Sequence, residues 1–355
     1  MKIMTGQIDV TLSEIEFKKR MREKFYDPSY KTVETELEKV IHVAWNNYIE
    51  YHRSPIVKAA GKNFSDPQFK LASEWLETHF KLKKAAIVQK KSKKKSKILV
   101  ICGSPRNDQT CPGEMSKTFR LAKIAEKEIH AANFECDFLD LSRLTSEYGK
   151  VIHPCKACVS TAMPLCNWPC SCYPNHALEQ TNDWMAEIYE KWTTAHGVMI
   201  CTPVHWYQSP SVLKLMIDRL VCADGGNPDP TLTRGKDPKK AKELELKGWD
   251  YPKHLAGRAF SVVVHGDAAG VENLRRILTD WLTDLELIPS GKASQVESYI
   301  GYYKPYATSH QELDKDKDLQ LEVKNAALSL VEQVRLIRSG KFKKPDKNLL
   351  EPKQK

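Results

Sequence analysis

The stretch "KILVICGSPR" (Lys97–Arg106) decides the fold class of this 355-residue chain. Its first six residues are an apolar, β-branched run without polar alternation, which is typical of a strand buried on both faces of a parallel sheet. A glycine-containing turn follows, and then an amphipathic pattern that predicts a helix over about 114–130. This order of strand, loop and helix predicts the first unit of an α/β domain.

The same order repeats along the chain. Further strands are predicted in "FECDFLDL" (134–141), "GVMICTP" (197–203) and "RAFSVVVHG" (258–266), with a short fifth strand near 288–293. The helical patterns between and after them cover 211–221, 271–285 and about 312–337. We therefore predict a three-layer, doubly wound, five-stranded parallel sheet, in which ligands lie beyond the carboxyl ends of the strands.

The α/β domain is predicted to span 98–340, after a helical extension (1–90) and a basic linker (91–97) and before a basic tail (341–355). In the extension, "SEIE" and "SDPQ" predict capped helix starts at Ser13 and Ser65. An apolar stripe there predicts one buried face of a long helix, made of Val33, Leu37, Val40, Ile41, Ala44, Trp45, Tyr48 and Ile49.

The net charge of +10 comes largely from lysine runs such as "KKSKKKSK" (90–97). Such runs are typical of solvated linkers and tails, and no zinc-finger or RNA-recognition spacing accompanies them, so we do not predict nucleic-acid binding. The N-terminus lacks the apolar stretch of a signal peptide, and no run is long enough to span a membrane. We expect a cytoplasmic protein without membrane partners.

The loop after the first strand, "GSPRNDQTCPGEMSKT" (103–118), combines hydroxyl groups with positive charge. The N-terminus of the next helix adds free N–H groups at the same place. This set suits a phosphate monoester, although an ordinary turn with Ser/Thr caps would show the same residues. The candidate binding residues are Ser104, Arg106, Thr110, Ser116, Lys117 and Thr118.

Two later loops add aromatic and glycine residues at the same edge of the predicted sheet. "TPVHWYQSP" (202–210) places three consecutive rings after a strand, where a planar heteroaromatic ligand would stack. "VVHGDAAG" (263–270) offers backbone N–H groups beside its glycines. The candidate residues are Pro203, Val204, His205, Trp206 and Tyr207 in the first of these loops, and His265, Gly266 and Asp267 in the second.

The segments "GSPR", "TPVHWYQSPSVLKLMIDR" and "VVHGD" resemble the flavin-contacting segments of the flavodoxin-like NAD(P)H-dependent FMN reductases, over about 97–340. The resemblance implies FMN, with its phosphate in the 104–118 loop and its ring between 203–207 and His265–Asp267. It further implies NADPH or NADH as reductant, a small acceptor such as a flavin or quinone, and a homodimer or homotetramer. We predict no catalytic side chain, because hydride passes directly between nicotinamide and flavin.

The segment "CKACVSTAMPLCNWPCSC" contains Cys155, Cys158, Cys166, Cys170 and Cys172. Three interpretations stay open: buried packing residues, a [4Fe–4S] cluster as in the iron–sulfur flavoproteins of this fold class, or a zinc site. We therefore assign no metal ligand among them. The alternative functions are accordingly an iron–sulfur flavoprotein in electron transfer, or a flavin-binding module without catalysis. The polar insertion 223–258 is interpreted as a lid or dimer arm.

Overall fold

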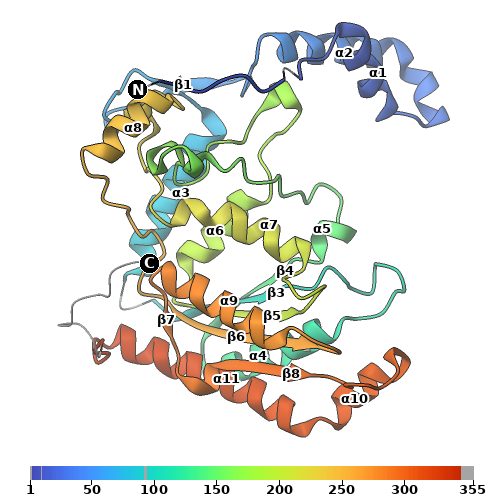
Figure 1. Ribbon diagram of the computed structural model, residues 1–355, viewed down its shortest axis with the longest axis vertical. Helices are drawn as coiled ribbons and strands as arrows, with labels where there is room; N and C mark the ends of the chain where they lie inside the picture. Colours follow the sequence, from blue (N-terminus) through green and yellow to red (C-terminus); the bar gives the residue numbers. More distant parts are fainter. Residues whose placement is uncertain (1, 9, 92–93, 345–355) are drawn as a thin grey trace. The chain divides into compact units, whose positions relative to one another are not determined.

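The computed structural model describes residues 2–8, 10–91 and 94–344, which fall into two compact units (Figure 1). The first unit consists of Leu82–Lys150, Glu187–Leu220 and Lys253–Lys355. The second unit consists of Met1–Lys81, Val151–Ala186 and Val221–Pro252. Residues 92–93 of the predicted linker and 345–355 of the predicted tail lie outside the described residues.

A parallel sheet forms the centre of the first unit, which we call the sheet unit. Its strands follow the order β4-β3-β5-β6-β7, and β8 also pairs with β6. This is the strand order of the flavodoxin-like fold, so the predicted fold class is confirmed. The strands are β3 (Lys97–Cys102), β4 (Glu135–Asp140), β5 (Gly197–Pro203), β6 (Ala259–Gly266), β7 (Ile288–Pro289) and β8 (Gln295–Tyr299).

The predicted fifth strand is divided in two, so the described sheet has six strands instead of five. β7 pairs only with Ala259 and Phe260, whereas β8 pairs with Val262–Gly266 further along β6. Pro289 has no N–H to continue the ladder, and the 3-10 turn η7 (Lys292–Ser294) separates the two pieces. Two short strands therefore share one edge of β6.

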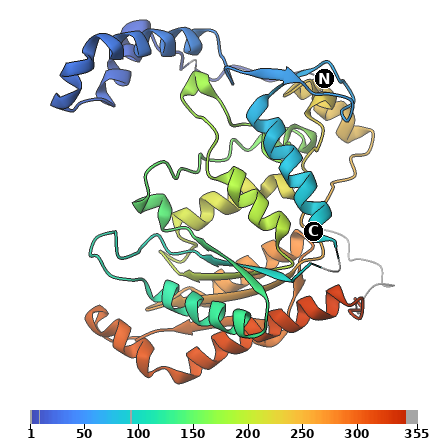
Figure 2. The same cartoon turned by 180° about the vertical axis from the view of Figure 1, so that it is seen from behind.

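Helices cover both faces of this sheet. On one face α4 (Lys117–Ala131) and α11 (Lys317–Arg338) lie side by side (Figure 2), and their apolar residues bury the side chains of Ile98, Val100 and Met199. The opposite face carries α7 (Ser211–Arg219) and α9 (Val271–Asp284). This unit also contains the second half of α3 (Ser73–Gln89), α5 (Arg143–Ser146), most of α6 (Met185–Thr194), the 3-10 helix η8 (Tyr306–Thr308) and α10 (Ser309–Lys315).

Helix boundaries follow local capping. α4 begins at Lys117, later than predicted, because the Ser116 hydroxyl accepts the Phe119 amide and ends the preceding loop. The predicted C-terminal helix is interrupted at Asp316, whose carboxylate accepts the Leu319 amide and starts α11.

The second unit is built from short elements. It contains α1 (Glu14–Glu23), η1 (Pro28–Val33), α2 (Glu34–Ile49) and an antiparallel pair, β1 (Val57–Ala59) with β2 (Lys70–Ala72), followed by the start of α3 (Ser73–Gln89). The cysteine segment forms the 3-10 turns η2 (Cys158–Ser160) and η3 (Met163–Leu165), with η4 (His176–Leu178) beyond it. The polar insertion contains η6 (Pro230–Thr233) and α8 (Pro238–Leu246).

The apolar stripe predicted for the N-terminal extension is confirmed in part. It lies on α2, where Ile41 is buried; the half-buried members are Leu37, Ala44, Trp45 and Tyr48, and the exposed ones are Val33, Val40 and Ile49. The helix start predicted at "SDPQ" was wrong: the Ser65 and Asp66 amides donate to Asp229 (2.7 Å) and Thr231 (3.1 Å) in a turn, and the chain continues into β2. The capped start at Ser13 is confirmed.

Helices within the described residues are too short or too polar to cross a bilayer.

Candidate functional site

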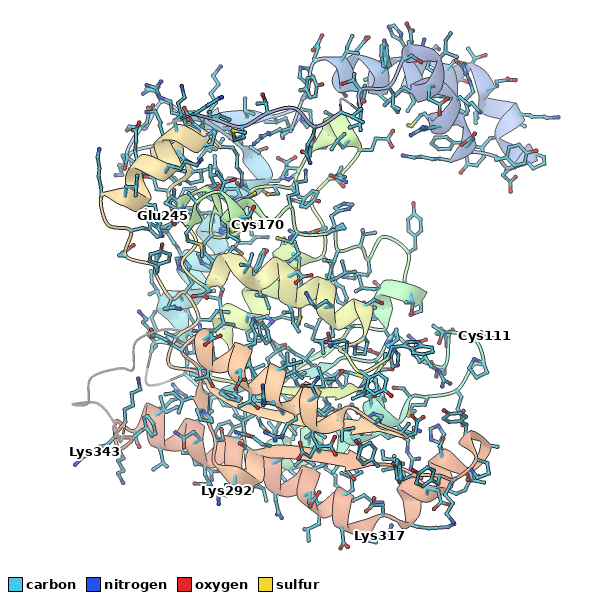
Figure 3. All side chains as sticks on the ribbon, in the orientation of Figure 1. Cys111, Cys170, Glu245, Lys292, Lys317 and Lys343 are labelled. Atoms are coloured by element: carbon cyan, nitrogen blue, oxygen red, sulfur yellow. The ribbon has the colours of Figure 1, made fainter. Side chains whose placement is uncertain are left out.

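A cavity of about 420 Å³ lies at the carboxyl edge of the sheet unit, where the loops after β3, β5 and β6 meet. Its volume falls within the range of about 300–1,000 Å³ that is typical of small-molecule and cofactor pockets. A strand edge of this kind is also where doubly wound folds bind their ligands. Figure 3 shows the described side chains, with Cys111 labelled in the loop after β3.

One end of the cavity is suited to an anion. The N-terminus of α4 points there. Lys117 and Thr118 are its first two residues, so their amides have no acceptor within the helix and can bind an anion. The side chains of Arg106 and Lys117 add positive charge. Burial lowers the pKa of Lys117, and Arg106 acts in the same direction while Asp267 opposes it.

The β3 loop approaches this end because Gly103 packs closely on β5. A Cβ atom at Gly103 would lie 2.8 Å from the hydroxyl oxygen of Thr202, so a side chain cannot be placed there without a shift. The buried Ser104 hydroxyl then accepts the Arg106 amide (3.1 Å) and holds the turn. Close packing therefore explains this glycine.

The floor of the cavity is a buried histidine that stays neutral. His265 Nε2 and Thr118 Oγ1 are 2.7 Å apart in a hydrogen bond between the end of β6 and the first turn of α4. Burial, with the nearby positive charge of Lys117, lowers the pKa of His265 to about 3. A neutral imidazole at this depth supplies a hydrogen-bonding group without a second charge.

A C-terminal segment closes another side of the cavity. His310 Nδ1 accepts a hydrogen bond from the Arg120 guanidinium (3.0 Å), and His310 Nε2 lies 3.2 Å from the carboxylate of Glu114. Burial lowers the pKa of His310. These contacts attach the start of α10 to the first turn of α4, through Arg120, and to the loop that precedes it, through Glu114.

Eleven of the fourteen candidate residues line the cavity: Ser104, Arg106, Ser116, Lys117, Thr118, Pro203, Val204, His205, His265, Gly266 and Asp267. Thr110 does not, because its hydroxyl bonds the backbone of Asn107 within its own loop. Trp206 and Tyr207 do not line it either, with 93% and 62% of their surface exposed and both with positive φ.

Six lining residues were not predicted: Pro112, Glu114, Tyr306, Ala307, Ser309 and His310. Pro112 and Glu114 lie in the loop 103–118, which was already predicted from the sequence to bind a phosphate. The other four follow β8 and come next to the β3 loop only through the fold, so a local pattern could not have found them.

The cysteine segment belongs to the second unit and is not arranged like a metal centre. Cys158 Sγ and Cys172 Sγ are 3.4 Å apart, and the ammonium of Lys236 lies 3.5 Å from each. Among the described residues there is no third Cys, His or carboxylate ligand atom within 4.8 Å of both sulfurs. A zinc ion needs four ligands around one point. The thiolates of a [4Fe–4S] cluster each bind a different iron and cannot be in contact. In contact with each other and with Lys236, Cys158 and Cys172 therefore fit neither a zinc ion nor an iron–sulfur cluster.

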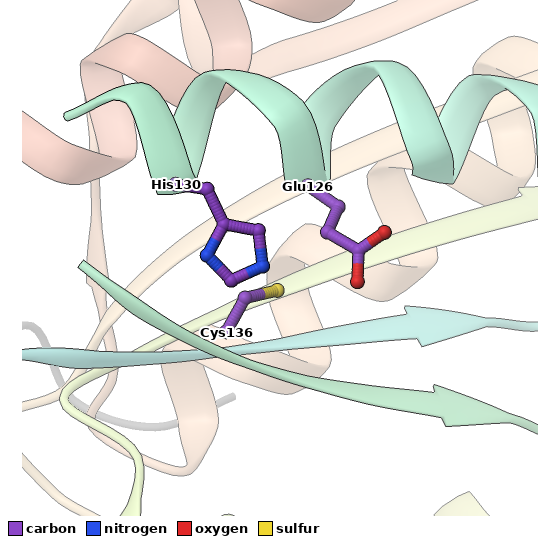
Figure 4. A group of neighbouring side chains, drawn as sticks. All are labelled: Glu126, His130 and Cys136. Carbon is purple, nitrogen blue, oxygen red and sulfur yellow. The ribbon is translucent and has the colours of Figure 1, made fainter. Parts of the chain in front are cut away.

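A different trio does bring three possible ligands together. Glu126 and His130 on α4 and Cys136 on β4 point toward one another, with ligand atoms within 4.8 Å (Figure 4). The Glu126 carboxylate is already paired with Lys123. Burial raises the pKa of the Cys136 thiol to about 12. Within the trio, Glu126 is therefore engaged in an ion pair and Cys136 is a neutral thiol.

Two comparisons with known sequences gave matches. The family model described as NADPH-dependent FMN reductase matches residues 96–294, more than half of the chain. An iron–sulfur flavoprotein of Methanosarcina thermophila is 31% identical over 125 residues, which are 35% of this chain and 52% of the relative. The chain thus spans about half the length of the curated relative that it matches.

Solved structures with similar folds are more distant in sequence. RosB with the bound intermediate 8-demethyl-8-formylriboflavin-5'-phosphate is 12% identical, with a TM-score of 0.48 over 70% of this chain and 82% of RosB. An NADH:FMN oxidoreductase (EMOB) is 16% identical, with a TM-score of 0.36 over 71% of this chain and 92% of that chain. Since both scores are below 0.5, the fold rests on the strand order, and the family rests on the sequence match. The chain belongs to the NADPH-dependent FMN reductase family.

Proposed function

We propose that the protein is an FMN-dependent NAD(P)H oxidoreductase that passes reducing equivalents through bound flavin to a small acceptor, such as a flavin or a quinone. The observation that carries this proposal is the cavity of the sheet unit. It joins an anion site at a helix N-terminus to the two loops that follow β5 and β6, in a chain of the FMN reductase family.

The residues present fit FMN. Its phosphate would lie at the N-terminus of α4, held by Arg106, Lys117 and the hydroxyls of Ser104 and Ser116. Its ring would lie beside the residues Pro203–His205 and His265–Asp267. Bound FMN would supply hydride and electron transfer, which needs no side chain as acid or base.

The chain's own contribution is binding and orientation. Arg106 and Lys117 would neutralise the phosphate charge, which is otherwise costly to withdraw from water. His265 stays uncharged and holds the Thr118 hydroxyl, so the floor of the site keeps its shape while charge on the ligand changes. We assign no proton transfer to a side chain.

The direct test is reduction of the FMN-loaded protein by nicotinamide. FMN-loaded protein mixed anaerobically with NADPH or NADH should lose its yellow absorbance, and an added quinone or flavin should restore it. Tight FMN binding without bleaching by either nucleotide would contradict the proposal and support a flavin-binding module without catalysis.

A second candidate is electron transfer by an iron–sulfur flavoprotein, which the relative from Methanosarcina thermophila suggests. Iron and sulfide in stoichiometric amounts after anaerobic purification would support it. The contact between Cys158, Cys172 and Lys236 favours the first candidate, because it leaves these sulfurs unsuited to hold a cluster.

Pairing of protomers around the flavin is also a proposal, which light scattering of the FMN-loaded protein would test.

A further inference from the structure

In the second unit, the ammonium of Lys236 is directed at two sulfur atoms. Its three possible hydrogen bonds reach the carbonyl oxygen of Leu165 (2.9 Å), Cys158 Sγ (3.5 Å) and Cys172 Sγ (3.5 Å). Desolvation lowers the pKa of Lys236, but the nearby sulfurs, Cys172 and Cys158 first, outweigh it, so that the pKa is raised. Lys236 is thus a cation held against two cysteine sulfurs.

Cys158 and Cys172 differ in exposure from Cys166, a buried cysteine of the same segment. Cys166 is buried, and burial raises the pKa of its thiol well above the ordinary value. Cys158 and Cys172 are partly exposed. A hydrogen bond from Cys172 and the charge of Lys236, against desolvation, lower the pKa of Cys158 to about 6. Cys158 is therefore a thiolate near neutral pH, with Cys172 as its hydrogen-bond donor.

We propose that Cys158 and Cys172 form a redox-active dithiol that exchanges with small-molecule disulfides, with Lys236 as the positioning residue that stabilises the Cys158 thiolate. The sulfurs are already in van der Waals contact, at 3.4 Å, and must approach by about 1.4 Å to reach the length of an S–S bond. A nearby lysine is a known way to activate a thiol, and partial exposure lets a small disulfide reach it. This dithiol is independent of the flavin proposal.

The exchange balances in two steps. The Cys158 thiolate attacks one sulfur of a disulfide RSSR, the S–S bond of the reagent breaks, and RS⁻ leaves as Cys158 forms a mixed disulfide. The Cys172 thiol then gives up its proton and attacks Cys158 Sγ, which expels the second RS⁻. Two electrons pass from the two cysteines to RSSR. The proton released by Cys172 ends on one RS⁻ to give RSH, and the other RS⁻ leaves as a thiolate or takes a proton from water.

The test uses the full chain, reduced, under anaerobic conditions, with glutathione disulfide as the oxidant. After free thiols are blocked, chymotryptic cleavage after Leu165 separates Cys158 from Cys172, so mass spectrometry without reductant detects a link between two peptides. We expect the Cys158–Cys172 disulfide. In Cys172→Ser, we expect one glutathione trapped on Cys158 instead.

The role of Lys236 is tested by the pH profile of alkylation. The rate at which iodoacetamide modifies Cys158 should have its midpoint near pH 6. Lys236→Met should move that midpoint upward by a pH unit or more, and Lys236→Arg should largely restore it, because a positive charge is kept. Cys155→Ser is the matched control, since Cys155 is a partly exposed cysteine of the same segment and should leave both readouts unchanged.

Two results would overturn the proposal. One is the absence of a Cys158–Cys172 link together with glutathione spread evenly over the exposed cysteines. The other is stoichiometric iron or zinc in the purified protein that disappears in Cys158→Ser but persists in Cys136→Ser. The second control separates the cysteine segment from the Glu126–His130–Cys136 trio. Neither readout depends on flavin, so a failure here is distinguishable from a failure of the reductase proposal.

Discussion

Thr118 and His265 are 147 positions apart in the sequence and 2.7 Å apart in the structure, in a buried hydrogen bond between a hydroxyl and an imidazole nitrogen. The bond connects the first turn of α4, which carries the anion site, to the end of β6, which borders the cavity. It therefore couples the two ends of the proposed flavin site through one contact.

Removing this contact should weaken both the fold and the site. Thr118→Val keeps the shape of the side chain but leaves a buried ring nitrogen without its partner, which costs about 1–3 kcal/mol. We expect urea unfolding to report that loss, together with weaker FMN binding. Thr283→Val, at an exposed position of α9, is the control and should change neither. Equal changes in unfolding free energy and FMN affinity for the two substitutions would show that the Thr118–His265 bond stabilises neither the fold nor the site.

The positive charge at the start of α4 should be specific for the phosphate. Lys117→Met removes a charge-assisted interaction worth about 1.5–3 kcal/mol, so the dissociation constant for FMN should rise about 10- to 100-fold. Riboflavin, which lacks the phosphate, should bind the variant as it binds the wild type. Lys127→Met, exposed on the same helix, is the matched control. An equal loss for FMN and riboflavin would place the phosphate elsewhere.

Stability should fall in mild acid because of His196. Its Nδ1 accepts the Lys97 amide (3.1 Å), and its Nε2 donates to the carbonyl of Gln89 (3.0 Å), which only the neutral ring can do. Burial, with the positive charge of Arg338, lowers the pKa of His196 from 6.5 to about 4. Between these values the unfolded chain binds a proton that the folded chain does not. The free energy of unfolding should therefore drop as pH falls through this window, by at most about 1.4 kcal/mol per pH unit from this residue.

The contribution of His196 is measured as a difference in how steeply the free energy of unfolding changes with pH. In His196→Asn, urea unfolding from pH 7 to pH 4 should show a shallower decline than in the wild type. His130→Asn, at an exposed position of α4, should keep the wild-type slope. An unchanged slope in the His196 variant would mean that this ring is protonated equally in the folded and unfolded chains.

Gly270 should tolerate alanine worse than another left-handed glycine. Its φ is +98°, and an added Cβ would lie 3.1 Å from Tyr207 Cα. Gly291 has a φ of +91° with nothing within 4 Å. Both alanine variants carry the left-handed strain of about 1–2 kcal/mol, but only Gly270→Ala also displaces the loop after β5. We expect greater destabilisation and weaker FMN binding for Gly270→Ala alone. Identical behaviour of the two variants would contradict the close approach.

The buried strands could be predicted because their signal is local. β3, β5 and β6 are continuous apolar runs, and such runs are read directly from sequence. Their order then brings the loops that follow them to one edge, so most of the cavity lining followed from three segments. The division of the last edge between β7 and β8 was missed, because Pro289 acts on a strand too short to show a pattern.

The failures have non-local causes. At Ser65 no helix begins, and Asp229, 164 positions away, holds the Ser65 amide in a turn. The stripe on α2 indicates an apolar face, but periodicity does not say how far a partner covers it: Ile41 is buried and Val40 is exposed. Stacking of the exposed Trp206 side chain on a ligand stays a prediction. His310 reaches the cavity only through its contacts with Arg120 and Glu114.

The central claim is that the loops after β3, β5 and β6 form one binding site for a flavin ring and its phosphate. Equilibrium titration of the purified chain with FMN, and in parallel with riboflavin, tests it most directly. The account predicts one FMN per chain and binding of riboflavin that is at least about 10-fold weaker, because riboflavin leaves the anion site empty. No uptake of FMN, or equal affinity for the two flavins, would contradict it.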